Sequence, residues 1–230
     1  MHIVEIFSSI EGEGIRAGYL CTFIRTYGCN LSCTYCDSMY ACEKDNYVDM
    51  NIDSILSECI RLGNRRITIT GGEPLLQPNM DQLIACLLES DFEVNVETNG
   101  SLDVSTTRNS VMSKCTENIS NLFFTIDFKC PFSGMESHMQ RCNYVKNAKK
   151  FDVVKFVVSD IQDLDAMYVL VKMMIDMLGN KDLPHIFVSP VFGKIELVEI
   201  VEYLKKYNLQ DVRLQIQLHK VIWNPDERGV

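Results

Sequence analysis

The chain has 230 residues, of which 47% are hydrophobic and 23% charged, and its formal net charge at pH 7 is -9. This length suffices for one core and the composition is that of an ordinary globular protein, so we expect a single domain over residues 1–230. An acidic chain without a concentrated Lys/Arg surface is not expected to bind nucleic acid in bulk, although one or two arginines would suffice for a small anionic substrate.

The sequence contains no stretch long enough to span a membrane, and its first residues lack the basic and then apolar segments of a secretion signal. We therefore expect a cytoplasmic protein that makes no contact with a membrane. Disulfides are rare in that compartment, so the ten cysteines are not expected to form a disulfide framework. Cys21, Cys59 and Cys86 fall within apolar strand or helix patterns and are expected to be small core residues.

Short runs rich in β-branched and aromatic residues alternate with helical patterns along the chain. The expected strands are residues 21–26, 66–70, 93–97, 122–127, 153–158, 185–189 and 212–218. Helices are expected over residues 52–62, 80–88 and 164–178, and the helical pattern over 104–115 is weak. Strands that alternate with helices predict a parallel sheet with right-handed crossovers. Six or seven such units are too few for a closed eight-fold barrel, so we expect an open or partial barrel.

The loop after the first expected strand carries Cys29, Cys33 and Cys36 in a C-x3-C-x2-C spacing. Thiolates are the usual ligands of iron–sulfur clusters, which normally take four of them. Three thiolates on a four-iron cluster would leave one iron open to a ligand that is not protein, and an open iron indicates chemistry rather than electron transfer. The alternative at this point is a zinc knuckle completed by Cys42 or a histidine.

Distinctive polar motifs also follow the later strands. They are G-G-E-P at 71–74, T-N-G at 98–100, D-F-K at 127–129, S-D at 159–160, S-P at 189–190 and finally His219. Because parallel sheets carry their sites at the C-terminal ends of the strands, we expect all of these motifs to face one cavity.

The cysteine triplet after the first strand and the G-G-E-P motif after the second are specific marks in combination. With them, the chain resembles the radical S-adenosylmethionine (radical SAM) enzymes over nearly its whole length. The resemblance implies a partial (β/α)6-type barrel with parallel strands and outer helices. It also implies a 4Fe–4S cluster on the three cysteines, with the amine and carboxylate of SAM on the open iron. Gly71 and Gly72 have no side chains and would let the backbone approach the cofactor amine closely.

Within that superfamily the chain looks most similar to the 7-carboxy-7-deazaguanine synthases. The segments that carry this likeness are residues 7–14, 23–25, 36–38, 217–220, 223 and 228–230. The resemblance implies a lyase that contracts the ring of 6-carboxy-5,6,7,8-tetrahydropterin to 7-carboxy-7-deazaguanine, with loss of ammonia, in queuosine and deazapurine biosynthesis. A 5′-deoxyadenosyl radical would start the reaction, and no side chain is assigned as a general base.

The residues that this resemblance places on the substrate are Ile10, Glu11, Gly12, Glu13, Arg25, Thr70 and Val230. A guanidinium recognises a carboxylate through two parallel hydrogen bonds, which suits Arg25. Glu11 and Glu13 would accept hydrogen bonds from pterin N–H groups, although relatives often have an amide at the position of Glu11. Ser38, where relatives often have threonine, would be the protein ligand of a Mg²⁺ ion, together with substrate oxygens and water.

The residues that the resemblance places on SAM are Tyr35, Cys36, Asp37, Gly72, Glu97, Asp127, Phe128, Lys129, Val188, Ser189, Pro190 and Val191. Relatives commonly show a Ser-Pro-Lys-like run at the position of residues 127–129. A flavodoxin or ferredoxin is the implied electron donor, and a homodimer is the implied assembly. The basic residues that would form a docking patch for the donor near the cluster are Arg16, Lys44, Arg61, Arg65 and Arg66.

Two other functions stay open at this stage. A glycyl-radical-enzyme activase is also small and has the same cysteine spacing; Gly14-Ile15-Arg16 and the 127–129 run favour it, while residues 12–14, 36–38 and Trp223 count against it. A metal-binding structural or electron-carrier protein is the alternative that is not an enzyme. The four histidines form no H-x-E or H-E-x-x-H motif, which argues against a zinc hydrolase or deaminase.

Overall fold

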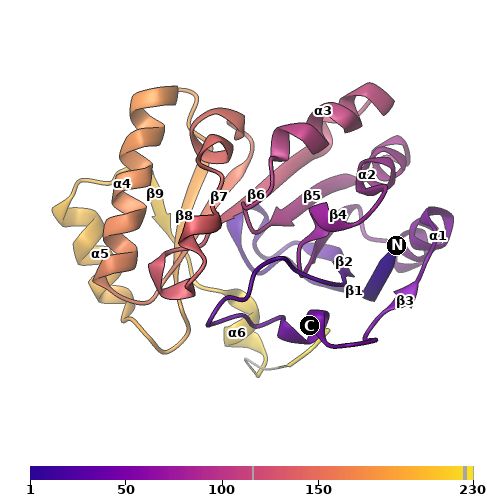
Figure 1. The fold of residues 1–230 in the computed structure, drawn as a ribbon, viewed down its shortest axis with the longest axis horizontal. Helices are drawn as coiled ribbons and strands as arrows, with labels where there is room; N and C mark the ends of the chain where they lie inside the picture. Colours follow the sequence, from indigo (N-terminus) through magenta and orange to yellow (C-terminus); the bar gives the residue numbers. More distant parts are fainter. Residues whose placement is uncertain (116, 225–226, 230) are drawn as a thin grey trace.

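The computed structural model describes residues 1–115, 117–224 and 227–229, and its strands form one open sheet (Figure 1). From edge to edge the strand order is β3-β1-β2-β4-β5-β6-β7-β8-β9. The strands are β1 His2–Ile10, β2 Leu20–Thr26, β3 Val48–Asp49, β4 Arg66–Gly71, β5 Glu93–Thr98, β6 Leu122–Phe128, β7 Val153–Val158, β8 His185–Pro190 and β9 Val212–Leu214. Neighbours from β2 to β9 are parallel, whereas β1 is antiparallel to β2 and β3. The α/β class with a parallel, partial barrel is confirmed.

The sequence patterns missed β1 and β3 and placed the end of the last strand wrongly. The strand expected over 212–218 stops at Leu214, and a helix begins at Leu218. The Gln215 amide still donates to the Val188 carbonyl of β8 at 2.9 Å, while its side chain contacts the loop after β1. Its Oε1 accepts a hydrogen bond from the Gly14 amide at 2.8 Å, and its Nε2 donates to Glu13 Oε1 at 3.2 Å.

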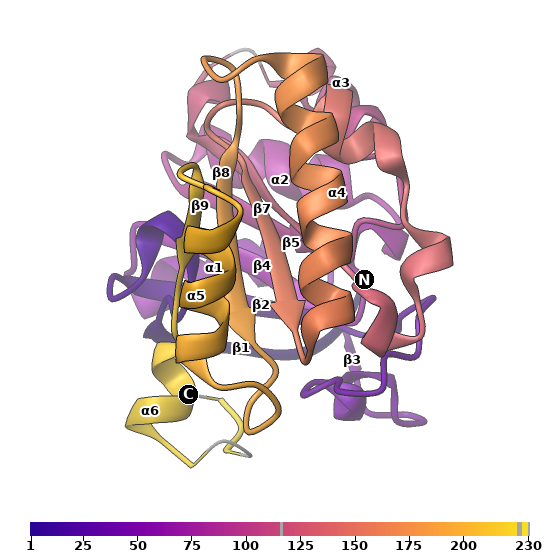
Figure 2. The same cartoon turned by 90° about the vertical axis from the view of Figure 1, so that its left-hand side faces the viewer.

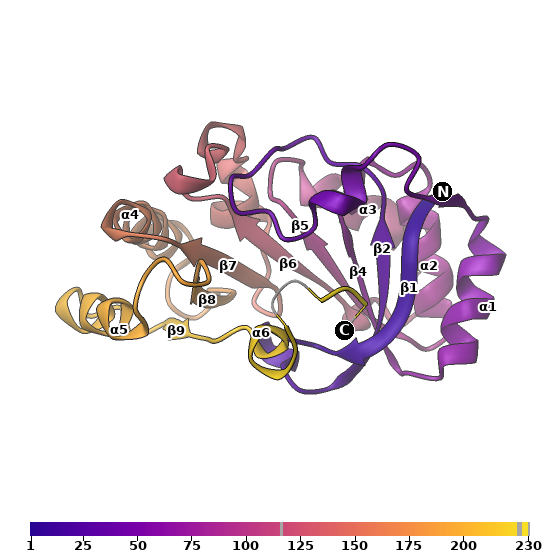
Figure 3. The ribbon, with the colours of Figure 1, turned by 90° about the horizontal axis from the view of Figure 1, so that it is seen from below.

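Helices cover the outer side of the curved sheet. They are α1 Ile52–Leu62, α2 Met80–Glu89, α3 Val104–Lys114, α4 Ile161–Leu178 and α5 Leu197–Lys206 (Figures 1 and 2). The short helix α6, Leu218–Ile222, lies instead on the inner side near β1 (Figure 3), where the Leu218 amide donates to the Gly12 carbonyl at 3.1 Å. The weakly patterned α3 forms because Asp103 caps its first turn and Arg108 makes a buried ion pair with Asp152.

The two faces of the parallel strands differ, because successive side chains of a strand point to opposite sides. Apolar side chains such as Ile69, Val96, Ile126 and Phe156 are fully buried in the core. The residues that alternate with them are polar and face the inner side: Thr68, Thr70, Asn95, Glu97, Thr125, Asp127 and Lys155. The fold therefore presents a polar inner face, which is where the candidate site lies.

Two of the three cysteines expected in the core are there. Cys21 and Cys59 are buried, whereas Cys86 in α2 is only partly buried. None of the described helices combines the length and the apolar character that a membrane span requires.

Candidate active site

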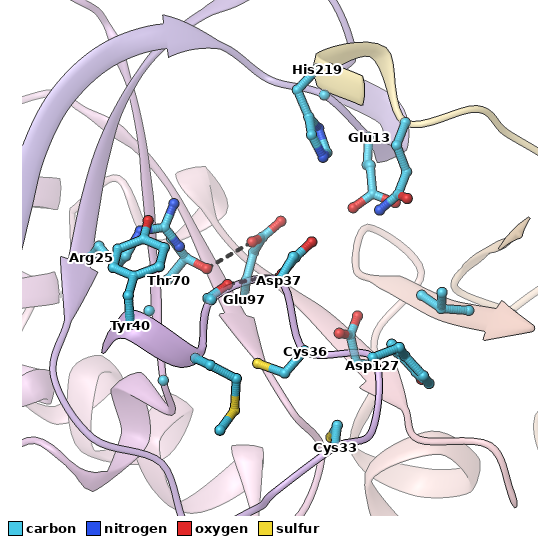
Figure 4. Close-up of a pocket in the computed structure, with 18 of the residues that line it drawn as sticks. Glu13, Arg25, Cys33, Cys36, Asp37, Tyr40, Thr70, Glu97, Asp127 and His219 are labelled. Carbon is cyan, nitrogen blue, oxygen red and sulfur yellow. Dashed lines mark hydrogen bonds between the residues drawn. The ribbon is translucent and has the colours of Figure 1, made fainter. Parts of the chain in front are cut away.

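A cavity of about 470 Å³ lies on the inner face, at the C-terminal ends of the parallel strands. Figure 4 shows Cys33 and Cys36 at one end of it and Glu13 and His219 at the other. The sequence-predicted site residues that line it are Ile10, Glu11, Gly12, Glu13, Arg25, Cys29, Cys33, Tyr35, Cys36, Asp37, Ser38, Thr70, Gly72, Glu97, Asp127, Lys129 and Val191. Motifs 71–74, 98–100, 127–129 and His219 contribute to the lining as expected, but motifs 159–160 and 189–190 do not.

The cysteine loop forms one wall of the cavity. Cys29, Cys33 and Cys36 are free thiols that line the same space. In the described part of the chain, no three His, Cys, Asp or Glu side chains are gathered closely around the position of a single ion. A four-iron cluster is larger than one ion and takes one thiolate per iron, so three thiols spread along one loop suit it. Burial raises the pKa of Cys33 and Cys36, so bound iron would be needed to keep them as thiolates at neutral pH.

Gly71 and Gly72, at the end of β4, pack closely against the backbone at the start of the cysteine loop. A Cβ on Gly72 would lie 2.0 Å from the carbonyl oxygen of Gly28, and one on Gly71 would lie 2.2 Å from that of Thr26. The amide of Gly72 donates to the Thr26 carbonyl at 3.1 Å, and the next amide, of Glu73, donates to the Gly28 carbonyl at 2.8 Å. The glycines are therefore required for β4 to pack against the start of the cysteine loop, a reason that the sequence reasoning missed.

Glu73 of the same motif is fully buried and has a structural task. Its carboxylate accepts hydrogen bonds from the Leu75 amide at 3.0 Å, the Thr98 hydroxyl at 2.8 Å and the Asn99 amide at 2.7 Å. Asn99 Nδ2 in turn lies 3.5 Å from the Cys29 Sγ. Glu73 thus ties the end of β5 to the end of β4 and holds Asn99 beside the cysteine loop.

A chain of alternating charges runs across the floor of the cavity. Lys129 Nζ lies 2.7 Å from Asp127 Oδ2, and Lys155 Nζ lies 3.3 Å from Asp127 Oδ1 and 2.8 Å from Glu13 Oε2. Burial disfavours ionisation of Asp127, but the two lysines outweigh it and hold the pKa of this carboxyl below its usual value. Lys155 was not predicted from sequence; the signal that would have found it is a lysine inside the otherwise apolar run of β7.

Two further carboxyls, Glu11 and Glu97, lie on the inner face without a cation at ion-pair distance in the described residues. The Thr68 hydroxyl donates to Glu11 Oε2 at 2.6 Å, and the Thr70 hydroxyl donates to Glu97 Oε2 at 2.9 Å (Figure 4). Burial, and then the neighbouring Glu97, raise the pKa of Glu11 to about 8. Burial also raises the pKa of Glu97. The pair is therefore suited to hold a proton or to accept hydrogen bonds from a ligand rich in N–H groups.

Arg25 is oriented by a residue that no motif indicated. Its Nε donates to Glu5 Oε1 at 2.7 Å, and the Tyr40 hydroxyl donates to the same oxygen at 2.7 Å. The guanidinium of Arg228 lies 4.2 Å from the centroid of the Tyr40 ring. Because Nε is occupied, a two-point contact between Arg25 and a carboxylate has to use the two Nη nitrogens.

Described residues after β9 also line the cavity: Gln217, His219, Lys220, Asn224 and residues 227–229. Lys220 Nζ lies 3.3 Å from Asp37 Oδ2, and the Ser38 hydroxyl donates to Asp37 Oδ1 at 2.9 Å. A Cβ on Gly12 would lie 2.4 Å from Nδ1 of His219, so the glycine makes room for this ring. Burial lowers the pKa of His219, which keeps it neutral at pH 7. Val230, expected at the substrate, lies outside the described residues.

Several residues predicted at SAM lie beside the cavity without lining it. Phe128 packs on Tyr144 with ring centroids 5.4 Å apart, and Val188 is fully buried in the core. Ser189 lies below the floor, where its hydroxyl is 3.4 Å from Glu13 Oε1, and Pro190 ends β8. A contact between these four residues and the cofactor stays a prediction.

The docking patch expected for an electron donor is wrong in two respects. Arg16 is 8% exposed, with its guanidinium 3.4 Å from the centroid of the Phe123 ring, so it cannot belong to a surface patch. Arg65 and Arg66 pair with Glu93 at the start of β4. The cysteine loop packs at the other end of that strand, about 20 Å away for six residues of extended chain.

Comparisons with known proteins agree with this geometry. A sequence profile described as the Radical SAM superfamily matches residues 23–112. A 7-carboxy-7-deazaguanine synthase of Clostridium acetobutylicum is 44% identical over 235 residues, which cover 99% of this chain and 98% of that protein. One from Chlorobaculum tepidum is 35% identical over 230 residues, which cover 100% of this chain and 97% of that protein. The crystal structure of QueE from Escherichia coli superposes with a TM-score of 0.71 at 23% identity, covering 95% of this chain and 94% of that one, and so has the same fold.

Proposed function

Because this chain belongs to the 7-carboxy-7-deazaguanine synthase family of radical SAM enzymes, we propose that its cavity contracts the ring of 6-carboxy-5,6,7,8-tetrahydropterin. The products are 7-carboxy-7-deazaguanine and ammonia, whose atoms together equal those of the substrate, so no net oxidant is consumed. The observation that carries the proposal is that one cavity holds both the cysteine loop and, across from it, Arg25 and the inner-face carboxyls. A radical source and a site for a carboxylated, N–H-rich ligand thus face each other.

The residues of the cysteine loop fit a cluster and SAM. Cys29, Cys33 and Cys36 would hold the cluster, which when bound would supply the electron that cleaves SAM to methionine and a hydrogen-abstracting 5′-deoxyadenosyl radical. The hydroxyl of Tyr35 is buried without a hydrogen-bond partner among the described residues, which leaves it free to bond to the cofactor. Lys129, buried beside the loop, would hold Asp127 ionised so that this carboxylate can accept hydrogen bonds from hydroxyl or amine groups.

On the opposite side, the inner-face residues suit the pterin. Arg25, through its two Nη nitrogens, would bind the carboxylate of the substrate. Glu11 and Glu13 would accept hydrogen bonds from the N–H groups of the pterin ring. Because Glu97 bonds to Thr70 and lies next to Glu11, we now place it with the substrate rather than with SAM.

The chemistry of Ser38 fits a Mg²⁺ ion held mainly by the substrate and water. A hydroxyl has one donor hydrogen and two acceptor lone pairs, so Ser38 can donate to Asp37 and still bind a cation. Mg²⁺ prefers oxygen ligands and retains several waters, which requires only one ligand from the protein. The ion would hold the substrate in place and stabilise negative charge on its oxygens.

The protein positions the substrate and excludes water more than it transfers protons. Helix α6 and the described residues after it, Asn224 and residues 227–229, contribute to the cavity lining, and α6 is held there by the Leu218–Gly12 hydrogen bond and the Lys220–Asp37 pair. No side chain is assigned as a general base. The homodimer and the flavodoxin or ferredoxin donor stay predictions that rest on the family likeness, and the cytoplasmic location stays a prediction from the sequence.

The test is a product assay under anaerobic conditions. Reconstituted and reduced enzyme is mixed with SAM, Mg²⁺ and 6-carboxy-5,6,7,8-tetrahydropterin, and 7-carboxy-7-deazaguanine and 5′-deoxyadenosine are quantified. We expect 7-carboxy-7-deazaguanine to form and to require SAM and the reductant. Formation of 5′-deoxyadenosine without 7-carboxy-7-deazaguanine would contradict the synthase function and would favour the glycyl-radical-enzyme activase. A requirement for Mg²⁺ is tested by repeating the assay with a chelator.

A further inference from the structure

Lys155 lies where neither a motif nor the family likeness placed a functional residue. It is the third residue of β7, in the run V-V-K-F-V-V, and its side chain reaches the inner face of the sheet. It is only 7% exposed. A buried ammonium is costly unless it is paired, so its position depends on the partners that the fold supplies.

These partners come from two separate segments. Asp127, 3.3 Å from the ammonium, is the register neighbour of Lys155 on β6. Glu13, 2.8 Å from the ammonium, comes from the loop after β1 and is 142 residues away in the sequence. Lys155 therefore joins the end of β6 to the loop after β1, although three strands lie between β1 and β6 in the sheet.

Each carboxylate is also held on its far side. Asp127 Oδ2 pairs with Lys129 at 2.7 Å, and Glu13 Oε1 accepts a hydrogen bond from Gln215 Nε2 at 3.2 Å. Burial lowers the pKa of Lys155, but Asp127 and Glu13 outweigh burial and raise this pKa above its usual value. Lys155 therefore keeps its proton and acts as a fixed positive charge between two fixed carboxylates.

We propose that Lys155 is a positioning residue that sets the spacing between the substrate side and the SAM side of the cavity. The inference rests on the proposed function, in which Glu13 contacts the pterin and Asp127 contacts SAM. Hydrogen transfer between the two ligands requires them to be in contact, and a displacement of about 1 Å costs up to about a hundredfold in rate. Without Lys155, Glu13 and Asp127 would face each other as like charges, and their repulsion would widen this spacing.

The experiment compares how well radical formation is coupled to product in Lys155→Met, Lys155→Arg and Glu13→Gln. Each variant is reconstituted anaerobically, its iron content is checked, and the ratio of 7-carboxy-7-deazaguanine to accumulated 5′-deoxyadenosine is measured in one reaction. Lys205→Met is the matched control, because it removes an exposed lysine that is paired with Glu202 on the outer helix α5. We expect wild-type iron content in Lys155→Met and a ratio that falls about tenfold or more, because misplacement of about 1 Å has costs of this size.

The conservative variants separate positioning from folding. Lys155→Arg keeps the charge and should recover part of the ratio, whereas Lys205→Met should keep all of it. If Lys155→Met does not bind the cluster, the inference is tested with Lys155→Arg and Glu13→Gln. A wild-type ratio of 7-carboxy-7-deazaguanine to 5′-deoxyadenosine in both of these variants would overturn the inference. A wild-type product ratio in Lys155→Met that has bound its cluster would also overturn the inference. So would an equal loss of 7-carboxy-7-deazaguanine and of 5′-deoxyadenosine in that variant. Absence of 7-carboxy-7-deazaguanine from the wild-type reaction would instead refute the proposed function.

Discussion

Glu5 and Arg25 are register partners on the antiparallel strands β1 and β2, and Arg25 Nε donates to Glu5 Oε1 at 2.7 Å. The hydroxyl of Tyr40 donates to the same oxygen. One carboxylate, outside the lining of the cavity, thus orients two side chains that line it. Glu5 therefore fixes the orientation in which the Arg25 guanidinium is presented to a ligand.

We predict that Glu5→Ala raises the KM for the carboxylated substrate and leaves kcat nearly unchanged. Hydrogen bonds to charged groups contribute about 1.5–3 kcal/mol, so loss of this orientation should raise KM about tenfold or more. Steady-state kinetics at saturating SAM provide the measurement. Glu58→Ala is the control, because it breaks an exposed Glu–Arg pair on α1 with Arg61, far from the cavity. An unchanged KM in Glu5→Ala would show that Glu5 does not support substrate binding.

Glu11 provides a prediction about the pH dependence of stability. Its pKa is raised from 4.5 to about 8 by burial and by Glu97. A raised pKa means that the folded state resists ionisation, so stability falls as pH rises from about 4.5 to 8 and levels off above that. Glu11→Gln removes this penalty and should be more stable than wild type at pH 8 by about 2 kcal/mol or more. The gain should shrink toward pH 5, as measured by urea unfolding at several pH values.

A pH-independent difference between Glu11→Gln and wild type would contradict a raised pKa at this position. The same variant also tests how Glu11 meets the substrate. The amide of Gln keeps an acceptor oxygen for a pterin N–H group at every pH, so Glu11→Gln should keep making product both below and above pH 8. The carboxyls and cations that face Glu11 are Glu97, Glu13 and Arg16.

Gly72→Ala should prevent the cysteine loop from holding its cluster. A Cβ at this position would lie 2.0 Å from a backbone oxygen of the loop, which has to move away. We expect the iron bound after anaerobic reconstitution to fall well below that of wild type. Gly63→Ala is the matched control: Gly63 ends α1 with φ +74° and a Cβ there meets nothing within 4 Å. It should cost about 1 kcal/mol of stability and keep its iron.

Cys33→Ala and Cys42→Ala separate a radical SAM cluster from a zinc site. Both cysteines line the cavity, but only Cys33 belongs to the triplet. Wild type and Cys42→Ala should bind about four irons and four sulfides per chain and change their absorbance on addition of SAM. Cys33→Ala should form no 5′-deoxyadenosine. Zinc in the purified protein with no response to SAM, or loss of the cluster in Cys42→Ala, would speak for the zinc knuckle.

Many elements of the fold were predictable because their signals are local. The alternation of β-rich runs with helical patterns indicated the parallel sheet, since both periodicities are visible within about ten residues. The antiparallel β1 was missed because its sequence, H-I-V-E-I-F-S-S-I, does not alternate strictly between polar and apolar residues. The end of β9 was misplaced for a different reason: apolar and polar residues keep alternating from Val212 to Leu218, although the strand ends at Leu214.

By itself, the sequence determined the α/β class, the cysteine loop and its place after the first parallel strand, because spacing and periodicity are properties of neighbouring residues. Only the tertiary structure decided which charges meet. Arg25 and Glu5 are 20 residues apart, and Lys155 and Glu13 are 142 apart. It also decided that Arg16 is buried and that Glu11 has a raised pKa, since burial depends on the whole fold. Ion pairing and desolvation depend on which groups lie close together in space, and this cannot be read from the order of residues alone.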